Sequence, residues 1–155
     1  MILKVSVNDD DYVLDISPSR SLAEVLREDI GLTGTKLACG EGFCGSCTVL
    51  LNGTPAASCL VPAAATGGRK VETVESLAPD DSDLSDLQQA LLIEDAVQCG
   101  MCFPGILMTL TALLKENPAP TETAIRSALV ANTCRCTGYE RIVDAVLALA
   151  NKEQA

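Results

Sequence analysis

The spacing of four cysteines constrains this chain more than any other feature of its sequence. Cys39, Cys44 and Cys47 follow one another in a C-x4-C-x2-C pattern, and Cys59 comes after eleven more residues. This is the spacing with which plant-type ferredoxins bind a [2Fe–2S] cluster. The sequence therefore predicts an iron–sulfur loop that is built on four thiolate ligands.

Small residues separate these cysteines. A loop around an anionic cluster has to turn backbone N–H groups inward, and glycine supplies the positive φ values that such a turn needs. Gly40, Gly42 and Gly45 stand at these places. They also spell G-x-G-x-x-G, but a dinucleotide site needs a helix after the last glycine. Residues 48–51 read as a strand instead, so we reject a dinucleotide site.

The chain contains eight cysteines and no histidine among its 155 residues. The missing histidine excludes cysteine–histidine nucleophilic catalysis, zinc sites that mix the two ligands, and Rieske clusters. About half of the residues are apolar, which is enough to build a core without disulfides, and the first residues read as a strand rather than a signal peptide. We therefore interpret the cysteines as metal ligands in the reducing cytoplasm.

The net charge of the chain argues against some classes of binding partner. A net charge of −10 without a basic patch argues against a nucleic-acid partner and against an anionic membrane surface. No apolar run reaches the length of a membrane span. We therefore expect neither a nucleic-acid partner nor a membrane-spanning segment.

The pattern of residues 1–77 predicts a small α+β domain. A capping box of Ser21 and Glu24 opens a helix that ends near Gly31. The pair Asn52-Gly53 is a strong hairpin signal. Alternating or β-branched runs predict strands at residues 2–7, 12–16, 48–51 and 70–74, with a turn at residues 8–11.

Residues 78–155 have a helical pattern, from which we expect a four-helix bundle. An acidic turn over residues 79–83 is expected to lead into the first helix, with Ser82 or Asp83 as its cap. Thr121 is expected to cap the third helix, and a Thr137–Glu140 capping box to open the fourth. The first two helices are predicted at residues 84–96 and 104–116.

A second set of four cysteines lies at the expected helix junctions, in the pattern C-x2-C-x31-C-x1-C: Cys99, Cys102, Cys134 and Cys136. Helix N-termini offer free N–H groups and the positive end of the helix dipole, and both favour thiolates. Two such junctions brought together would hold a second metal centre. Zinc also accepts four thiolates, and the residues by themselves leave a pair of disulfides open.

With both sets in view, the chain resembles the two-cluster iron–sulfur subunit of the xanthine oxidase family, the molybdenum hydroxylases. The resemblance covers almost the whole chain and is carried by motifs in residues 38–49, 97–105 and 132–139. It implies a ferredoxin-like β-grasp domain followed by a helical domain, each with one [2Fe–2S] cluster. The implied ligands are Cys39, Cys44, Cys47 and Cys59 for the first cluster, and Cys99, Cys102, Cys134 and Cys136 for the second.

The resemblance also implies a function. A family member of this length is the small subunit of a heteromeric oxidoreductase and contributes no catalytic residue. It relays electrons one at a time from a molybdopterin in a large partner subunit to FAD in another subunit or to a cytochrome. The second cluster of the family lies nearer the molybdopterin, and Gln98 and Cys136 are expected to contact that cofactor. Met101 and Phe103 depart from the residues that are usual in the family, without touching a ligand position.

Two alternatives belong to other classes of protein. A free two-cluster ferredoxin would diffuse between partners, and a large exposed apolar surface around Gly100, Met101 and Phe103 would argue against it. A zinc-stapled interaction module would contain zinc instead of about four irons per chain. The metal content and the co-purifying subunits separate these alternatives from the subunit of a larger enzyme.

Overall fold

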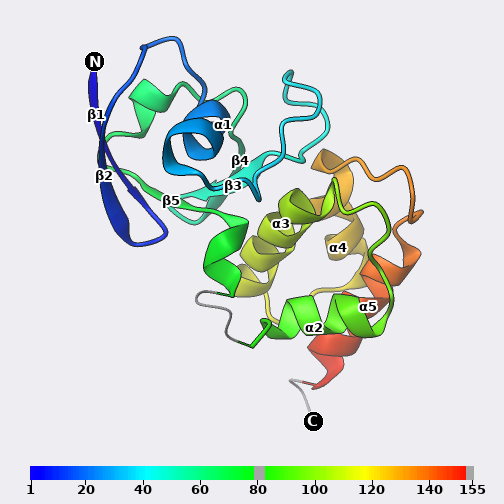
Figure 1. The fold of residues 1–155 in the computed structure, drawn as a ribbon. Coiled ribbons are helices and arrows are strands. Elements are labelled where there is room, and N and C mark those ends of the chain that lie inside the picture. The colour runs from blue at the N-terminus through cyan, green and yellow to red at the C-terminus, as the bar shows by residue number, and fades with distance from the viewer. Residues whose placement is uncertain (79–82, 153–155) are drawn as a thin grey trace.

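The chain folds into a sheet half and a helical half, and the computed structural model describes residues 1–78 and 83–152 (Figure 1). The sheet half contains β1 (Ile2–Val7), β2 (Asp10–Asp15), α1 (Leu22–Val25), a π-helical turn (Leu26–Ile30), β3 (Thr48–Leu51), β4 (Thr54–Ala57) and β5 (Lys70–Glu72). The helical half contains α2 (Asp86–Ile93), α3 (Phe103–Glu116), α4 (Glu122–Ala128) and α5 (Glu140–Lys152). Short 3-10 turns cover Ala63–Thr66, Val74–Leu77 and Leu129–Ala131.

The five strands form one mixed sheet in the order β2-β1-β5-β3-β4. β1 and β5 run parallel, and the other neighbours are antiparallel. Asn8 and Asp9 both have positive φ, so the first hairpin closes through a two-residue turn and β2 starts at Asp10, two residues earlier than expected. The Asn52-Gly53 turn between β3 and β4 is present as predicted.

One face of the sheet is covered by α1. Leu3, Val5 and Val7 are buried on the same face of β1, as the alternation in the sequence predicts. The capping box of Ser21 and Glu24 forms, because the Ser21 side chain accepts from the backbone N–H of Glu24 and the Glu24 side chain accepts from that of Ser21. This half is therefore the α+β unit that the sequence predicts, and its core residues are Leu3, Val5, Val7, Ile16, Leu22, Val25, Leu26, Val49, Ala63 and Val71.

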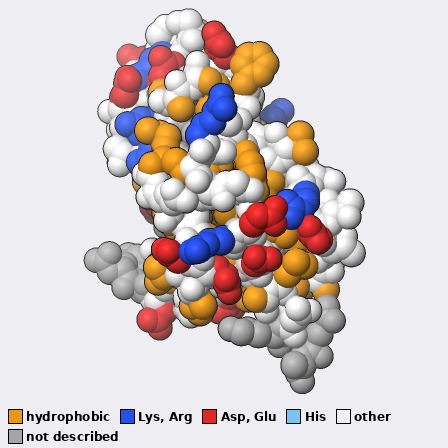
Figure 2. All heavy atoms as spheres, turned by 90° about the vertical axis from the view of Figure 1, so that its right-hand side faces the viewer, with side chains coloured by type: hydrophobic (Ala, Val, Ile, Leu, Met, Phe, Trp, Pro, Cys, Tyr) orange, Lys and Arg blue, Asp and Glu red, His pale blue; other side chains and the backbone are white. Residues whose placement is uncertain are grey.

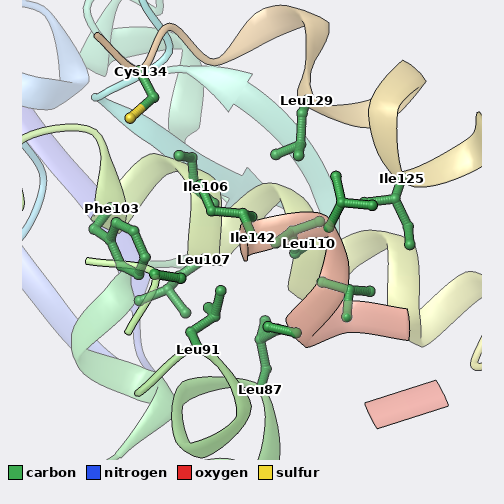
Figure 3. Packing of buried hydrophobic residues seen from close by; sticks show 14 of the residues in the cluster. Leu87, Leu91, Phe103, Ile106, Leu107, Leu110, Ile125, Leu129, Cys134 and Ile142 are labelled. Atoms are coloured by element: carbon green, nitrogen blue, oxygen red, sulfur yellow. The ribbon is translucent and has the colours of Figure 1, made fainter. Parts of the chain in front are cut away.

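The helices α2, α3, α4 and α5 surround a second core of aliphatic side chains (Figure 3). Leu91, Ile106, Leu110 and Ile142 are almost completely buried in it. Cys134 belongs to the same cluster and lies at one end of it in Figure 3, so the packing of this core reaches a predicted cluster ligand.

The two halves pack directly against each other through α3, which contacts β3 and β4. At the end of α3, the ammonium group of Lys115 lies 3.1 Å from the Glu72 carboxylate on β5. In the first turn of α3, Gly105 lies so close to Gly45 that a Cβ on Gly105 would overlap the Gly45 carbonyl oxygen. The relative position of the two halves is therefore set by backbone contacts as well as by side chains.

The start of α2 differs from the prediction. Ser85 is the N-cap, with Gln88 completing a capping box, and Asp83 lies outside the helix. Ser82 and residues 79–81 of the predicted acidic turn lie outside the described residues. Several residues here could cap the helix, but Ser85 has a glutamine three residues later. The Gln88 side chain accepts from the Ser85 backbone N–H, and the Ser85 hydroxyl accepts from the Gln88 backbone N–H.

The start of α5 also differs from the prediction. Thr137 does not cap the helix, because Gly138 and Tyr139 both have positive φ and the helix begins at Glu140. The Thr137 hydroxyl lies 3.0 Å from the sulfur of Cys134 and accepts from the Tyr139 backbone N–H. The residues that looked like a helix cap instead form part of a turn next to a cysteine.

Charged side chains of both signs are interspersed on the surface (Figure 2). Arg126, for example, lies 2.8 Å from Glu122 and 2.9 Å from Glu140. On the face in Figure 2, the described residues form no continuous basic patch. Within the described ranges, each helix is too short or too polar to cross a membrane.

Candidate iron–sulfur sites

The first cysteine set lies in the loop before β3 and just after β4. Cys47 is buried, and Cys39, Cys44 and Cys59 are half-buried. The glycines between them have the expected positive φ values of 69° at Gly40, 77° at Gly42 and 66° at Gly45. The strand predicted after the loop is present as β3, where a dinucleotide site would need a helix. The first cluster is therefore predicted to take three thiols from the loop before β3 and one from the turn after β4.

These four thiols lie in two pairs. Cys44 hydrogen-bonds Cys39, and Cys59 hydrogen-bonds Cys47. Backbone N–H groups point at the sulfurs as well, and the N–H of Glu41 lies 3.4 Å from the Cys39 sulfur. Such N–H···S contacts stabilise negative charge on sulfur, which is the property that cluster ligands need.

The local environments of the four cysteines give their thiols different pKa values. The backbone N–H groups of Glu41 and then Cys44 lower the pKa of Cys39 to about 6. Burial raises the pKa of Cys59 to about 11, and the Cys47 thiol adds to this shift. The loop therefore favours a thiolate at Cys39 before any metal binds.

These acidities predict an order of alkylation in the cluster-free chain. Cys39 is expected to react first with iodoacetamide at pH 7, with a rate that is half-maximal near its pKa of about 6. Cys59, whose pKa is about 11, stays a neutral thiol and should react slowly. Mass spectrometry of peptides labelled across the pH range checks this. If all cysteines instead react together around the ordinary pKa of about 8.5, the folded loop does not tune them.

The second cysteine set joins two turns of the helical half. Cys99 and Cys102 lie between α2 and α3, and Cys134 and Cys136 lie between the 3-10 turn after α4 and the start of α5. Cys102 is the N-cap of α3. The predicted placement of all four cysteines at helix junctions is confirmed, and the fold brings two junctions together that are more than thirty residues apart in the sequence.

This set is also paired. The sulfurs of Cys136 and Cys99 are 3.6 Å apart, and Cys102 hydrogen-bonds Cys134. The first of these pairs is exposed and the second is buried. Burial raises the pKa of Cys102 to about 12. Burial acts in the same direction on Cys134, but hydrogen bonds from the hydroxyl and the backbone N–H of Thr137 outweigh it, so that the pKa of Cys134 is lowered.

The paired arrangement fits a di-iron cluster. In a [2Fe–2S] cluster each iron takes two protein ligands, so four cysteines are needed as two pairs rather than as one tetrahedron. All eight cysteines are free thiols, so none of the donors is taken up in a disulfide. The arrangement of each quartet as two pairs therefore suits a [2Fe–2S] cluster at each site.

Gln98 and Cys136 lie next to each other on the surface. The side-chain nitrogen of Gln98 donates to the Cys136 carbonyl oxygen at 3.1 Å, and both residues are exposed. Met101, three residues after Gln98 in the sequence, is half-exposed. Phe103 is different, because it is 8% exposed and belongs to the helical core rather than to the expected apolar surface.

Contacts between the two cysteine loops were not anticipated from the sequence. The backbone N–H of Thr133 donates to the Cys44 carbonyl oxygen at 2.9 Å, and the Asn132 side-chain nitrogen donates to the Gly45 carbonyl oxygen at 3.2 Å. Figure 1 shows these segments side by side, the loop before β3 in cyan and the segment before α5 in orange. Asn132 and Thr133 belong to a motif of the resemblance, and that was the only signal in the sequence.

Comparison with known proteins gives a consistent result. Residues 5–78 match a family described as "2Fe-2S iron-sulfur cluster binding domain", and residues 73–147 match a "[2Fe-2S] binding domain". The nicotine 6-hydroxylase small subunit of Paenarthrobacter nicotinovorans is 46% identical over 94% of this chain and 87% of that protein. The nicotinate dehydrogenase small FeS subunit of Eubacterium barkeri is 42% identical over 93% and 91%.

Solved structures have the same fold. Quinoline 2-oxidoreductase from Pseudomonas putida 86 matches with a TM-score of 0.93 and 42% identity, over 99% of this chain and 96% of that one. The aldehyde oxidoreductase from Desulfovibrio desulfuricans matches with a TM-score of 0.93 and 37% identity, over 99% of this chain and 17% of that longer chain. The same two-part fold therefore occurs both as a separate chain and as part of a larger one.

The fold and the two thiol quartets define an iron–sulfur protein that carries two [2Fe–2S] clusters. The two sequence relatives named above are small subunits of a hydroxylase and a dehydrogenase. The chain belongs to the family of small iron–sulfur subunits of the molybdenum hydroxylases, the xanthine oxidase family.

Proposed function

We propose that this chain is the electron-transfer subunit of a heteromeric molybdenum hydroxylase. It relays electrons one at a time from a molybdopterin site in a large partner subunit, through two [2Fe–2S] clusters, to FAD in another subunit or to a different acceptor. The observation that carries this proposal is the pair of thiol quartets in one chain whose loops hydrogen-bond each other. Each cluster, when bound, accepts and releases a single electron.

The work of this chain is to hold and tune the clusters. We assign the first cluster to Cys39, Cys44, Cys47 and Cys59, and the second to Cys99, Cys102, Cys134 and Cys136. The N–H groups aimed at Cys39 and the Thr137 hydroxyl beside Cys134 stabilise thiolates at both sites. Burial of Cys47 and Cys102 keeps water away from one side of each site.

The domains follow from this assignment. We propose a ferredoxin-like β-grasp domain over residues 1–77 and a four-helix bundle domain over residues 78–155, each with one cluster. The separate cores of the sheet half and the helical half support this division. The hydrogen bond from Thr133 to Cys44 gives a short connection between them, because Thr133 precedes one ligand and Cys44 is another.

The exposed groups near each cluster suggest where partners bind. Gln98 and Cys136 lie on the surface beside the second quartet, and we propose that they contact the molybdopterin of the large subunit. Phe43 is 77% exposed and Leu60 is 61% exposed beside the first quartet. Apolar side chains in such positions are typical of protein contacts, so we assign this face to the flavin subunit or to another acceptor protein.

The free thiols are also compatible with a cytoplasmic complex, because cluster ligands must stay reduced until iron is inserted. A free two-cluster ferredoxin is less favoured, since the relatives are named as subunits of larger enzymes. The half-exposed Met101, between the ligands Cys99 and Cys102 in the sequence, also suits a permanent partner better than a solvated carrier surface.

Purification of the native complex tests the function. We expect the chain to co-purify with a molybdenum-containing subunit, with about four irons per copy of this chain and two distinguishable paramagnetic signals after reduction. The quantities to measure are metal content, subunit composition and the low-temperature paramagnetic resonance spectrum. A colourless protein that contains zinc would overturn the proposal, and so would a chain that elutes alone without molybdenum.

A further inference from the structure

The hydroxyl of Tyr139 joins two backbone groups of the segment that precedes α5. It accepts a hydrogen bond from the Cys134 backbone N–H at 2.8 Å and donates one to the Asn132 carbonyl oxygen at 2.9 Å. Tyr139 itself has φ of 70°, in the left-handed region that bulky residues rarely adopt. A side chain held at this cost in backbone strain has a position that the surrounding structure determines.

The segment that Tyr139 holds is the one that contacts the first cysteine loop. Thr133 donates to the Cys44 carbonyl oxygen, and the Asn132 side chain donates to that of Gly45. Asn132 is 1% exposed, and its side-chain oxygen has no hydrogen-bond partner among the described residues. Burying the unpaired side-chain oxygen of Asn132 costs free energy. The protein tolerates this cost while the side-chain nitrogen donates to Gly45, which indicates that this hydrogen bond matters to the fold.

The backbones of the two loops are in close contact around Gly45, which leaves little room for one loop to shift against the other. A Cβ on Gly45 would overlap the Ala131 carbonyl oxygen and would come within 2.6 Å of the Asn132 side-chain nitrogen. The loops therefore meet backbone to backbone, with hydrogen bonds on both sides of the contact. A shift of Asn132 and Thr133 would also move the adjacent Cys134, which is a proposed ligand of the second cluster.

We propose that Tyr139 and Asn132 are positioning residues that hold the ligand loop of the second cluster against that of the first. In this way they set the distance and the orientation between the two clusters. The inference rests on the proposed function, because it needs two clusters in one chain. Groups that support metal ligands commonly control the behaviour of a site without touching the metal, and electron transfer between two centres slows as their separation grows.

The test uses Tyr139→Phe in the complete complex, which removes one oxygen atom and keeps the ring. Tyr12→Phe is the matched control, because Tyr12 is the other tyrosine of the chain and its hydroxyl makes no hydrogen bond with a described residue. The substitution removes two part-buried hydrogen bonds, each worth about 0.5–1.5 kcal/mol, so amide exchange over residues 132–136 should accelerate by about tenfold in Tyr139→Phe. The exchange should not change in Tyr12→Phe.

The second measurement is the magnetic interaction between the two reduced clusters. In Tyr139→Phe this interaction should become weaker or more heterogeneous, with unchanged iron content, since every ligand is still present. Asn132→Ala gives an independent variant, which loses only the bond to Gly45. It should change the magnetic interaction while the Cys134 amide stays protected by Tyr139.

The outcomes separate this inference from the proposed function. A wild-type complex with fewer than two clusters would end the proposed function, and the inference with it. A wild-type complex with both clusters, together with variants that keep wild-type amide exchange and magnetic interaction, would overturn the inference alone. If Tyr139→Phe does not assemble, the magnetic interaction in Asn132→Ala decides the question.

Discussion

A complex that carries Cys102→Ser is expected to lose its second cluster and almost all turnover with its electron acceptor. Cys102 is buried at the start of α3 and paired with Cys134. It is therefore one of the two ligands in the buried pair of the proposed site. A serine hydroxyl at this place is a hard, weakly acidic ligand, whereas iron–sulfur clusters select soft thiolates. Iron should fall from about four to about two atoms per chain.

The expected loss of turnover in Cys102→Ser can be estimated from the effect of milder substitutions near metal sites. Removal of a group that merely supports a metal ligand commonly costs about 10–100-fold in affinity or activity, so loss of a ligand should cost at least about 100-fold in turnover. The measurements are iron content, the paramagnetic signals after reduction, and the rate of acceptor reduction. Molybdenum content should not change, because the molybdenum lies in another subunit.

Cys47→Ser is the matched variant in the first quartet. Cys47 is also buried and also paired with a second cysteine, in this case Cys59. It should lower turnover to a similar extent but remove the other paramagnetic signal. If both variants remove the same signal, or if Cys102→Ser keeps both, the assignment of the two quartets to separate clusters is wrong.

The cysteine quartets could be predicted from the sequence because the information for them is local. Three ligands of the first quartet lie within residues 39–47, and the second quartet combines two short motifs, Cys99–Cys102 and Cys134–Cys136. The glycines between the first three cysteines indicate the positive φ values that the structure has. The β1 strand and the α1 cap were predicted for the same reason, because alternation and capping boxes are patterns of a few neighbouring residues.

The ends of α2 and α5 were predicted less well, because local patterns compete there. Ser82, Asp83 and Ser85 are all suitable caps by residue type, and only the pairing with Gln88 favours Ser85. Thr137 has a glutamate three residues later and so matches a capping box. Its hydroxyl instead hydrogen-bonds the Cys134 sulfur, so a contact at the cluster site takes precedence over the local capping pattern.

The contact between the two halves could not be predicted from local patterns at all. Asn132 and Gly45 are 87 residues apart in the sequence, and nothing near either residue points to the other. The same holds for Gly105, which reads as an ordinary residue in the first turn of a helix. Only the folded chain brings these backbones together, and the connection between the two cluster sites depends on that contact.

Gly105→Ala is therefore expected to be strongly destabilising, although alanine is the better helix former. The new Cβ would overlap the Gly45 carbonyl oxygen and lie 3.1 Å from the Cα of Ser46, so the two halves would have to move apart. Overpacking of this kind costs about 1–3 kcal/mol, and backbone on the far side of the contact places this site near 3. The thermal midpoint should fall by roughly 10 °C, at about 2–4 °C per kcal/mol for a chain of this size.

Gly67→Ala is the control that separates close approach from backbone freedom. Gly67 has φ of −54°, which alanine adopts without strain, and the nearest atom to a new Cβ is the Lys4 carbonyl oxygen at 3.9 Å. This variant should be neutral or stabilised by up to about 1 kcal/mol. The midpoints can be followed by the loss of cluster absorbance on heating. Equal losses in both variants would mean that glycine as such is required, whereas a loss in Gly105→Ala alone would mean that the two cluster domains depend on direct backbone contact at α3.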